Sequence, residues 1–401
     1  MEKIFKEGLS AALFFLCLLA AFPAHADNNA ARKSYATKAE RREAEKILSR
    51  MSLRDKVGQM FWIRPEYLLE EIADGTVTPA SADEWASYHV TSVTPAMAAL
   101  YDEYPAGGVI LFTHNCTSPQ QLRAFVPQIK ALKGAPLVCV DEEGGRVSRL
   151  AVNDAFKLKK YESMAWLTQN GKKRGVYEAA RYIGSYLKEY GFDLDFAPDA
   201  DVNSNPDNPI IGTRSFSSHP DSAAAMACRY LDGLSASGVI GCLKHFPGHG
   251  DTKTDSHLGY AETQKTWEEM KRCETIPFKA GIRHGAEMIM AAHITAPNVD
   301  PRDIPSSLSS VLLQDKLRRE LGFANVIVSD AMEMRAISQQ YTPEQAAVLS
   351  IQAGVDVVLC VNSYKKAFDA VVNAVKAGTI SEERINESVR RILTIKIKHR
   401  K

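Results

Sequence analysis

The chain has 401 residues, of which 45% are hydrophobic and 24% charged, and its formal net charge is +1. These fractions are typical of a globular protein and exclude a disordered or fibrous chain. The near-neutral charge excludes a nucleic-acid partner bound through a basic surface, so we expect a small or neutral ligand.

The N-terminus has the composition of a secretory signal. Lys3 and Lys6 precede an apolar run from Leu9 to Phe22, and Ala24-His25-Ala26 forms a small-residue exit. We therefore predict a signal peptide over residues 1–26, a polar and helical extension over 27–48, and a single domain over 49–401. The mature chain would then be secreted or periplasmic and would have no stable membrane span, while an uncleaved membrane anchor is the alternative.

Eight short apolar runs alternate with amphipathic segments such as Val176–Tyr190, Ser222–Ala236 and Pro343–Ala353. The runs are Gln59–Ile63, Gly107–Phe112, Pro136–Val140, Phe192–Ala197, Val239–Leu243, Glu287–Ala291, Asn325–Ser329 and Asp356–Cys360. This is the pattern of repeating β/α units, and it predicts an α/β fold of the (β/α)8 TIM-barrel type. An open doubly wound sheet is the alternative, but no GxGxxG motif follows the first run.

Polar side chains follow most of these runs. They are Asp141, Asp199 and Asp201, Lys244 and His245, His293, and Asp330. The carboxyl ends of barrel strands converge on one face, so these residues should share a pocket. The long connection between Arg64 and Pro105 is expected to contain a helix and to border that pocket. Arg214, near the end of a turn-rich loop, is a candidate to bind an anion or a hydroxyl group.

Asp330 directly follows the run that ends at Ser329. A carboxylate fixed at a strand end can be held firmly enough to act as a nucleophile on a carbon centre. The alternative is a helix N-cap for a segment beginning at Ala331, because aspartate is a favoured cap.

A loop rich in histidine, acidic residues and glycine begins at Lys244 and extends to His257. Asp255 lies two residues before His257, and a carboxylate so placed can orient an imidazole and raise its basicity for proton transfer. An ordinary polar loop is one alternative. A metal site is another, built from His245, His249, Asp251, Asp255, His257 and His293, although the spacing matches no standard zinc motif. We expect neither a metal nor an organic cofactor, and we expect Cys139, Cys242 and Cys360 to be buried as free thiols.

Five ordered segments resemble a known family. They are Asp141-Glu142-Glu143-Gly144-Gly145-Arg146-Val147-Ser148-Arg149, Asp201-Val202-Asn203-Ser204-Asn205-Pro206, Ile211-Gly212-Thr213-Arg214-Ser215-Phe216, Lys244-His245-Phe246-Pro247-Gly248-His249-Gly250 with Asp255-Ser256-His257, and Leu321-Gly322-Phe323 leading to Val328-Ser329-Asp330. The combination resembles glycoside hydrolase family 3, in particular its β-N-acetylglucosaminidase branch. The resemblance extends from about Met51 to the C-terminus.

The resemblance implies a retaining mechanism in which Asp330 is the nucleophile and His257, paired with Asp255, is the acid and then the base. It also implies that the terminal sugar is held by Asp141, Arg149, Arg214, Lys244 and His245. Carboxylates can accept from sugar hydroxyls and cations can donate to them, which agrees with these roles. Most retaining glycosidases use two carboxyl groups, so here a histidine would replace one of them. A neutral histidine base would repel phosphate less than a carboxylate, so some phosphorolysis beside hydrolysis is a further hypothesis.

The expected function is that of an exo-β-N-acetylglucosaminidase that removes terminal β-linked N-acetylglucosamine from peptidoglycan-derived or chitin-like fragments. The partner is thus a carbohydrate substrate. A β-glucosidase of the same family is one alternative, and a noncatalytic glycan-binding barrel is another.

Overall fold

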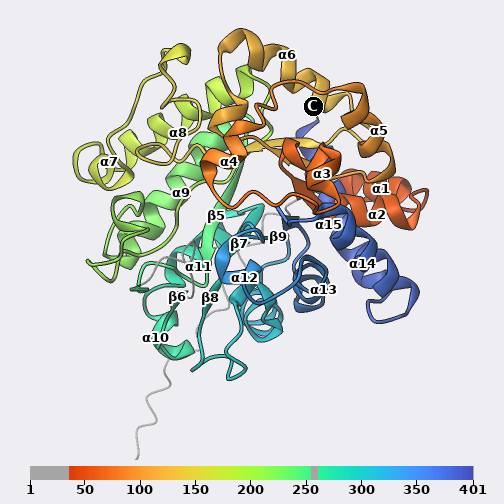
Figure 1. Ribbon diagram of the computed structural model, residues 1–401. Coiled ribbons are helices and arrows are strands. Elements are labelled where there is room, and N and C mark those ends of the chain that lie inside the picture. Colours follow the sequence, from red (N-terminus) through yellow and green to blue (C-terminus); the bar gives the residue numbers. More distant parts are fainter. Residues whose placement is uncertain (1–35, 254–260, 401) are drawn as a thin grey trace, which may run out of the picture. The chain divides into compact units, whose positions relative to one another are not determined.

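The computed structural model describes residues 36–253 and 261–400, and within these ranges eight parallel strands form a barrel (Figure 1). The strands are β1 (Phe61–Ile63), β2 (Gly108–Ile110), β3 (Leu137–Val140), β4 (Leu194–Asp195), β5 (Ile240–Phe246), β7 (Met288–Ala291), β9 (Val326–Ser329) and β10 (Val358–Leu359). Their spatial order is β10-β1-β2-β3-β4-β5-β7-β9. A parallel bridge between Val328 and Val357 brings β9 back beside β10 and closes the ring.

The predicted fold is confirmed. Each of the eight apolar runs overlaps one barrel strand, and the closed ring shows that the doubly wound alternative is wrong. One boundary differs from the prediction, because β5 continues through Phe246. Lys244 and His245 therefore lie within the strand and not in the loop after it. Their backbone is held by the strand, which fixes the direction of both side chains.

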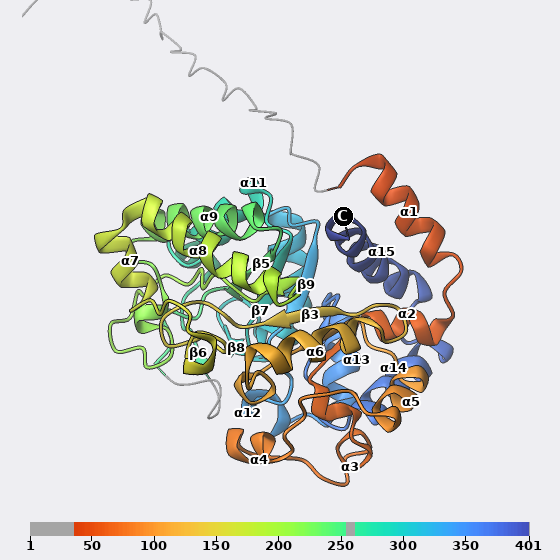
Figure 2. The ribbon, with the colours of Figure 1, turned by 90° about the horizontal axis from the view of Figure 1, so that it is seen from above.

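Helices surround the barrel (Figures 1 and 2). The longer ones are α1 (Lys38–Leu48), α2 (Leu53–Gln59), α5 (Pro95–Glu103), α6 (Pro119–Lys130), α7 (Met164–Asn170), α8 (Lys172–Glu189), α9 (Pro220–Ala236), α11 (Ile276–His284), the π-helical segment η6 (Val311–Glu320), α13 (Pro343–Ala353), α14 (Tyr364–Lys376) and α15 (Glu382–His399). Short helices or turns are η1 (Pro65–Leu68), α3 (Glu70–Ala73), α4 (Ala82–Ser87), η2 (Thr113–Asn115), η3 (Asp154–Phe156), η4 (Gly212–Arg214), α10 (Trp267–Lys271), η5 (Ser306–Leu308) and α12 (Arg335–Ser338). A separate two-stranded pair joins β6 (Ala261–Glu262) to β8 (Ile294–Thr295).

Local sequence signals explain several of these elements. Ser52 caps α2 by accepting a hydrogen bond from the backbone of Asp55, as serine commonly does at a helix start. In α15, Ile385 and Val389 belong to a buried stripe that faces the barrel. The strand interiors are fully buried, and Cys139 is a buried free thiol as expected. Cys242 and Cys360 are likewise buried and free.

The N-terminal part of the chain is described only from residue 36. The predicted signal peptide over residues 1–26 lies outside the described residues. Helix α1 falls in the predicted extension over 27–48 and packs against α15 (Figure 2). Glu45 accepts a hydrogen bond from Arg390 between these helices. Among the described residues, no helix is long and apolar enough to cross a membrane.

A buried ion cluster joins β10 to the outer helices. Asp356 accepts hydrogen bonds from Arg391 Nη1 at 2.9 Å and Ser388 Oγ at 2.6 Å, both on α15, and from Arg318 on η6. Arg384 lies 3.6 Å from the same carboxylate. Burial alone would raise the pKa of Asp356, but the three arginines hold it well below the ordinary value of 3.8.

We expect Asp356→Asn to lower the free energy of unfolding by about 3–5 kcal/mol near neutral pH, because three partly buried arginines would lose their counter-charge. A depressed carboxyl pKa stabilises the fold above the unfolded-state value and ceases to do so as the pH falls through the folded-state value. The difference between the two proteins should therefore shrink as the pH is lowered below 3.8. Urea unfolding at several pH values measures this.

Asp369→Asn is the matched control, because the side chains of the Arg54–Asp369 ion pair are 39% and 42% exposed, far more than those around Asp356, and the pair should contribute less. A loss for Asp356→Asn no greater than that of the control would contradict the assigned role of the cluster.

Candidate active site

A cavity of about 1420 Å³ opens at the carboxyl ends of the barrel strands. Six of the predicted site residues line it: Asp141, Arg149, Arg214, Lys244, His245 and Asp330. They come from the ends of β3, β5 and β9 and from the loops after β3 and β4. The barrel therefore brings together residues that are far apart in the sequence, as the strand-end argument predicts. Asp255 and His257 lie outside the described residues.

Asp330 is the first residue after β9. Its backbone N–H donates to the Ala291 carbonyl of β7 at 2.8 Å, and its Oδ1 accepts from the Ala331 backbone at the same distance. The next helix, α12, begins only at Arg335 and has Met334 as its N-cap residue. The alternative interpretation of Asp330 as the cap of a helix beginning at Ala331 is therefore wrong. The carboxylate is half-buried in the cavity wall, in a position set by two strands.

Asp141 follows β3 and is bonded to two cations of the cavity. Lys244 Nζ lies 2.9 Å from its Oδ1 and Arg149 Nη2 lies 3.3 Å from its Oδ2. Burial raises the pKa of Asp141, but Lys244 and Arg149 lower it by more, so the group is ionised. A carboxylate held by two cations in a cavity wall can still accept hydrogen bonds from ligand hydroxyl groups.

Glu143 is a central residue of the cavity that the sequence did not single out. Its Oε2 accepts a hydrogen bond from Arg214 Nε at 2.9 Å, and its Oε1 accepts one from Arg214 Nη2 at 2.7 Å. Lys244 Nζ lies 2.6 Å from the same Oε1. Burial alone would raise its pKa, yet these two cations hold it well below the ordinary value. Glu143 thus fixes the positions of two predicted ligand-binding side chains. The sequence signal was its place two residues after Asp141, at the same strand end.

The neighbouring Glu142 has a purely structural set of contacts. Its carboxylate accepts from the backbone of Arg149, Leu150 and Ala151 and from the Tyr186 hydroxyl. These bonds shape the turn that returns Arg149 to the cavity. Asp141 and Glu143 therefore bind the cations of the cavity, whereas Glu142 between them holds the backbone of the following turn.

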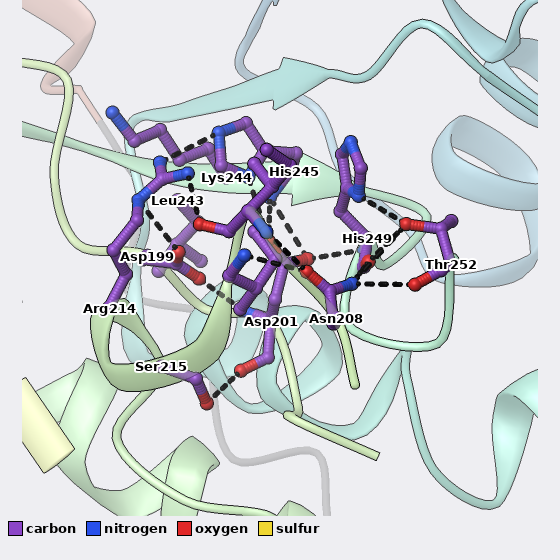
Figure 3. Close-up of polar contacts among 12 residues, drawn as sticks. Asp199, Asp201, Asn208, Arg214, Ser215, Leu243, Lys244, His245, His249 and Thr252 are labelled. Carbon is purple, nitrogen blue, oxygen red and sulfur yellow. Dashed lines mark hydrogen bonds and ion pairs between the residues drawn. The ribbon is translucent and has the colours of Figure 1, made fainter. Parts of the chain in front are cut away.

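His245 is held from both sides of its ring (Figure 3). Its Nδ1 donates to Asp201 Oδ2 at 2.7 Å, and its Nε2 accepts from Arg214 Nη2 at 3.3 Å, because a guanidinium can only donate. Burial, and then the Arg214 charge, lower the pKa of His245 to about 4. The ring is therefore neutral near neutral pH, with its tautomer set by Asp201.

Asp199, Asp201 and His245 are close enough to be considered as a metal site, since one ligand atom from each lies within 4.8 Å of the others. The donor set does not fit a metal, however. Asp201 already accepts from the backbone N–H of His249 at 2.7 Å and from His245, and the Arg214 guanidinium lies 3.5 Å from Asp199 Oδ2. A divalent cation would have to displace these donors and lie beside an arginine. Burial and the Asp201 charge raise the pKa of Asp199 to about 7. Protonation of Asp199, rather than a metal ion, can therefore reduce the negative charge of this cluster.

Two other histidines proposed as metal ligands, His249 and His293, have hydrogen-bonded partners in the described part of the chain. His293 Nε2 donates to the Ala331 carbonyl at 3.0 Å and its Nδ1 accepts from Ser307 Oγ at 2.8 Å. His249 Nδ1 lies 2.8 Å from Thr252 Oγ1 (Figure 3). His293 thus supports the backbone next to Asp330, and burial lowers the pKa of His249 to about 4.

Both ends of segment 254–260 are attached to the barrel. Before it, Asn208 Nδ2 donates to the carbonyls of His249 at 2.8 Å and Thr252 at 3.0 Å. After it, β6 pairs with β8, and Thr263 Oγ1 donates to Asp251 Oδ2 at 3.0 Å. The turn-rich loop over residues 201–218 therefore supports the histidine-rich loop as well as supplying Arg214.

The opposite wall of the cavity comes from the connection between β1 and β2. Residues 78–81 and Trp85 line the cavity, which confirms that this connection contains helices and borders the pocket. Arg64, at the end of β1, lies with its guanidinium carbon 3.7 Å from the centre of the Trp85 ring and donates to Glu333 Oε1 at 2.9 Å. The sequence did not predict Arg64 or Glu333 as cavity residues. In the sequence, Arg64 is marked only by its place directly after an apolar run, and Glu333 only by its place three positions after Asp330.

The family model described as "Glycosyl hydrolase family 3 N terminal domain" matches residues 52–395. Beta-hexosaminidase A of Pseudoalteromonas piscicida is 31% identical over 337 residues, which cover 77% of this chain and 56% of that protein. A beta-hexosaminidase of Neisseria meningitidis serogroup B is 35% identical over 264 residues, covering 64% of this chain and 71% of the relative.

A solved structure of a glycoside hydrolase family 3 β-N-acetylglucosaminidase from Paenibacillus sp. str. FPU-7 superposes with a TM-score of 0.74 at 33% identity. The match covers 87% of this chain and 63% of that one. The chain thus spans somewhat more than half the length of these longer relatives.

Proposed function

Since the chain belongs to glycosyl hydrolase family 3, we propose that it is a retaining exo-β-N-acetylglucosaminidase that acts on peptidoglycan-derived or chitin-like fragments. One observation carries the proposal. The Asp330 carboxylate opens on the same cavity as Asp141, Arg149, Arg214, Lys244 and His245, so a nucleophile and a set of sugar-binding groups face one ligand. Relatives named as hexosaminidases support the choice of an N-acetylated substrate.

The first step forms a bond between an Asp330 oxygen and the anomeric carbon while the bond to the leaving oxygen breaks. His257 donates its proton to that oxygen, and the aglycone leaves as an alcohol. In the second step His257 takes a proton from water, the water oxygen attacks the anomeric carbon, and the Asp330 carboxylate is released. The anomeric configuration is retained because the carbon is inverted twice.

The described histidines support the assignment of the proton transfer to His257. Burial lowers the pKa values of both His245 and His249 to about 4, so both rings are neutral near neutral pH and neither is suited to act as a general acid. Asp141 and Glu143 are ionised and bonded to cations. The loop from Lys244 to His257 begins at this cavity, which supports the assignment of the proton transfer to His257.

The sugar is held by paired charges. Asp141 accepts from two ring hydroxyl groups, and Lys244, Arg149 and Arg214 donate to hydroxyl groups and to the acetamido carbonyl. Each cation is already bonded to a carboxylate, so it donates from a fixed position and loses little conformational freedom on binding.

Comparison of chromogenic N-acetylglucosaminide and glucoside substrates tests the reaction. We expect the first to be cleaved with much higher kcat/KM. Preference for the glucoside would indicate a β-glucosidase, and binding of N-acetylglucosamine without turnover would indicate a glycan-binding barrel.

Two further measurements concern the natural substrate and the acceptor. Release of N-acetylglucosamine from chitobiose and from purified muropeptides compares the two substrate classes, and a search for sugar 1-phosphate in phosphate buffer tests phosphorolysis.

Glu143→Gln should lower kcat/KM for the N-acetylglucosaminide by about 100-fold, because a neutral amide cannot hold both Lys244 and Arg214 in place. Glu178→Gln is the control, since Glu178 is an exposed residue of α8 whose ion pair with Arg174 lies on the surface. Steady-state kinetics of the two variants provide the measurement. Equal activity of both would show that Glu143 does not position the binding groups.

Export is part of the proposal. The N-terminal composition of residues 1–26 supports cleavage after Ala26 and a site of action in the periplasm or outside the cell. N-terminal sequencing of the protein from fractionated cells tests this, and an intact N-terminus in the membrane fraction would indicate an uncleaved anchor.

A further inference from the structure

A second cavity, of about 780 Å³, lies at the amino-terminal end of the barrel, opposite the candidate active site. Gln59, Pro105 and Ala135 line it, and they precede β1, β2 and β3 respectively. The rest of its wall comes from α1, the end of α6 and α15, of which α1 and α15 lie side by side in Figure 2. We call this cavity the basic pocket, because its charged lining residues are Lys46, Arg50, Lys130, Lys133, Lys396 and Arg400 against only Glu43 and Asp55.

Half of these cations have an acidic partner. Lys130 Nζ lies 2.8 Å from Asp193, Lys133 Nζ lies 2.8 Å from Asp55, and Lys46 lies 4.0 Å from Glu43. The other three are Arg50, Lys396 and Arg400, which form no ion pair with any acidic residue in the described ranges 36–253 and 261–400. Within the part of the chain that the structure describes, the pocket thus holds three positive groups without an acidic partner.

Lys396 is the most informative of these cations, because only 1% of it is exposed. Its Nζ donates to Gln59 Oε1 at 2.8 Å and to the Ala135 carbonyl at 3.5 Å, and both partners are neutral. A buried ammonium without an anion is costly, so either the amine loses its proton or an anion accompanies it. Burial, and then the Arg400 charge, lower the pKa of Lys396 to about 7.

The groups packed around Lys396 do not supply the missing charge. The charge of Asp193 raises the pKa of Lys396, but Asp193 is bonded to Lys130 and to the Val138 backbone N–H. Cys139 on β3 is a buried thiol whose pKa burial raises further, so it remains neutral. From its own helix, Arg400 adds a second positive charge.

The remaining wall of the basic pocket is apolar and consists of Ile47, Met51, Leu132, Leu393 and Ile397. A cavity of this volume accommodates a small organic molecule. Guanidinium and ammonium groups together are the usual partners of phosphate oxygens. A ligand with a phosphate group and a compact apolar or sugar body would match both parts of the lining.

We propose that the basic pocket binds a small phosphate-bearing molecule, whose phosphate lies between Lys396, Arg50 and Arg400. The bound phosphate supplies the counter-charge that Lys396 lacks. Lys396 therefore gains a proton when the ligand binds, and binding couples to proton uptake. This site is separate from the proposed glycosidase site and does not depend on it.

Isothermal titration of the protein with phenyl phosphate and with inorganic phosphate tests the proposal. We expect one phenyl phosphate per chain, and uptake of about half a proton near pH 7 when buffers of different ionisation enthalpy are compared. Lys396→Met should weaken binding at least about tenfold and remove the proton uptake, while methionine fills the buried space. Arg400→Gln should also weaken binding, and Lys376→Met, an exposed lysine on α14, should leave it unchanged.

Three results would overturn the proposal. The first is the absence of phosphate binding at low ionic strength, which would mean that the cations only interact with the negative ends of the helix dipoles of α1, α6 and α15. The second is binding that Lys396→Met does not change, which would place the anion elsewhere, for example among the cations of the active-site cavity. The third is binding to vesicles containing phosphatidylglycerol without binding to phenyl phosphate, which would assign the surface to a lipid.

Discussion

Asp330→Ala is expected to lower kcat for N-acetylglucosaminides by about 10⁴-fold or more, equivalent to about 5.5 kcal/mol of transition-state stabilisation. Without the carboxylate no covalent intermediate can form, and the oxocarbenium-like transition state loses its nearest negative charge. The fold should tolerate the change, because the carboxylate is half-buried and its described hydrogen bond is to the adjacent Ala331 backbone. The binding groups at the ends of β3 and β5 remain.

Two measurements distinguish loss of the nucleophile from loss of the site. N-acetylglucosamine should still bind to the variant with an affinity within a few-fold of the parent protein, because Asp141, Lys244 and Arg214 hold it independently of Asp330. Mass spectrometry of the parent protein after reaction with a slow fluorinated N-acetylglucosaminyl donor should find the sugar on the peptide that contains Asp330. Residual turnover above about 1% in the variant, or a sugar attached to another residue, would contradict the assignment.

The fold could be predicted from the sequence because parallel strands buried on both sides are continuous apolar runs, and this signal depends only on local composition. Each run therefore identified a strand, and the polar residue after it identified a strand end. The extension of β5 through Phe246 was not predicted, since Lys244 and His245 interrupt the apolar pattern. Their burial is possible only because Glu143 and Asp201, from distant segments, neutralise or hydrogen-bond them.

The candidate site was predictable to a lesser degree. Asp141, Lys244 and Asp330 were identified because each directly follows one of the apolar runs. Glu143 and Arg64 were not, because their importance arises from partners that the fold brings close: Lys244 is 101 positions away from Glu143 in the chain, and Glu333 is 269 away from Arg64. Likewise, the buried Lys396 resembles any other lysine of a helix until the packing of α15 against α1 and α2 is known.

His257→Ala is expected to slow the cleavage of substrates according to how much their leaving group needs a proton. For chitobiose, whose leaving group is a sugar alcohol, we expect a loss of about 10²–10⁴-fold in kcat/KM. For a dinitrophenyl N-acetylglucosaminide, whose leaving group is stable as an anion, the loss in kcat/KM should be far smaller. Equal losses on both substrates would contradict a role for His257 as the general acid.

The second half of the reaction provides an independent check of the same residue. With the dinitrophenyl substrate, the His257→Ala protein should accumulate the glycosyl-Asp330 intermediate, because water attacks slowly without a base. Azide needs no deprotonation, so it should accelerate turnover and yield a β-configured glycosyl azide. Asp255→Asn should give a milder version of the same behaviour, and the alkaline limb of its kcat/KM profile should move to lower pH, since an imidazole without its carboxylate holds a proton less tightly. If azide had no effect on His257→Ala, the base would have to be another group, and the Asp255–His257 pair would lose its place in the mechanism.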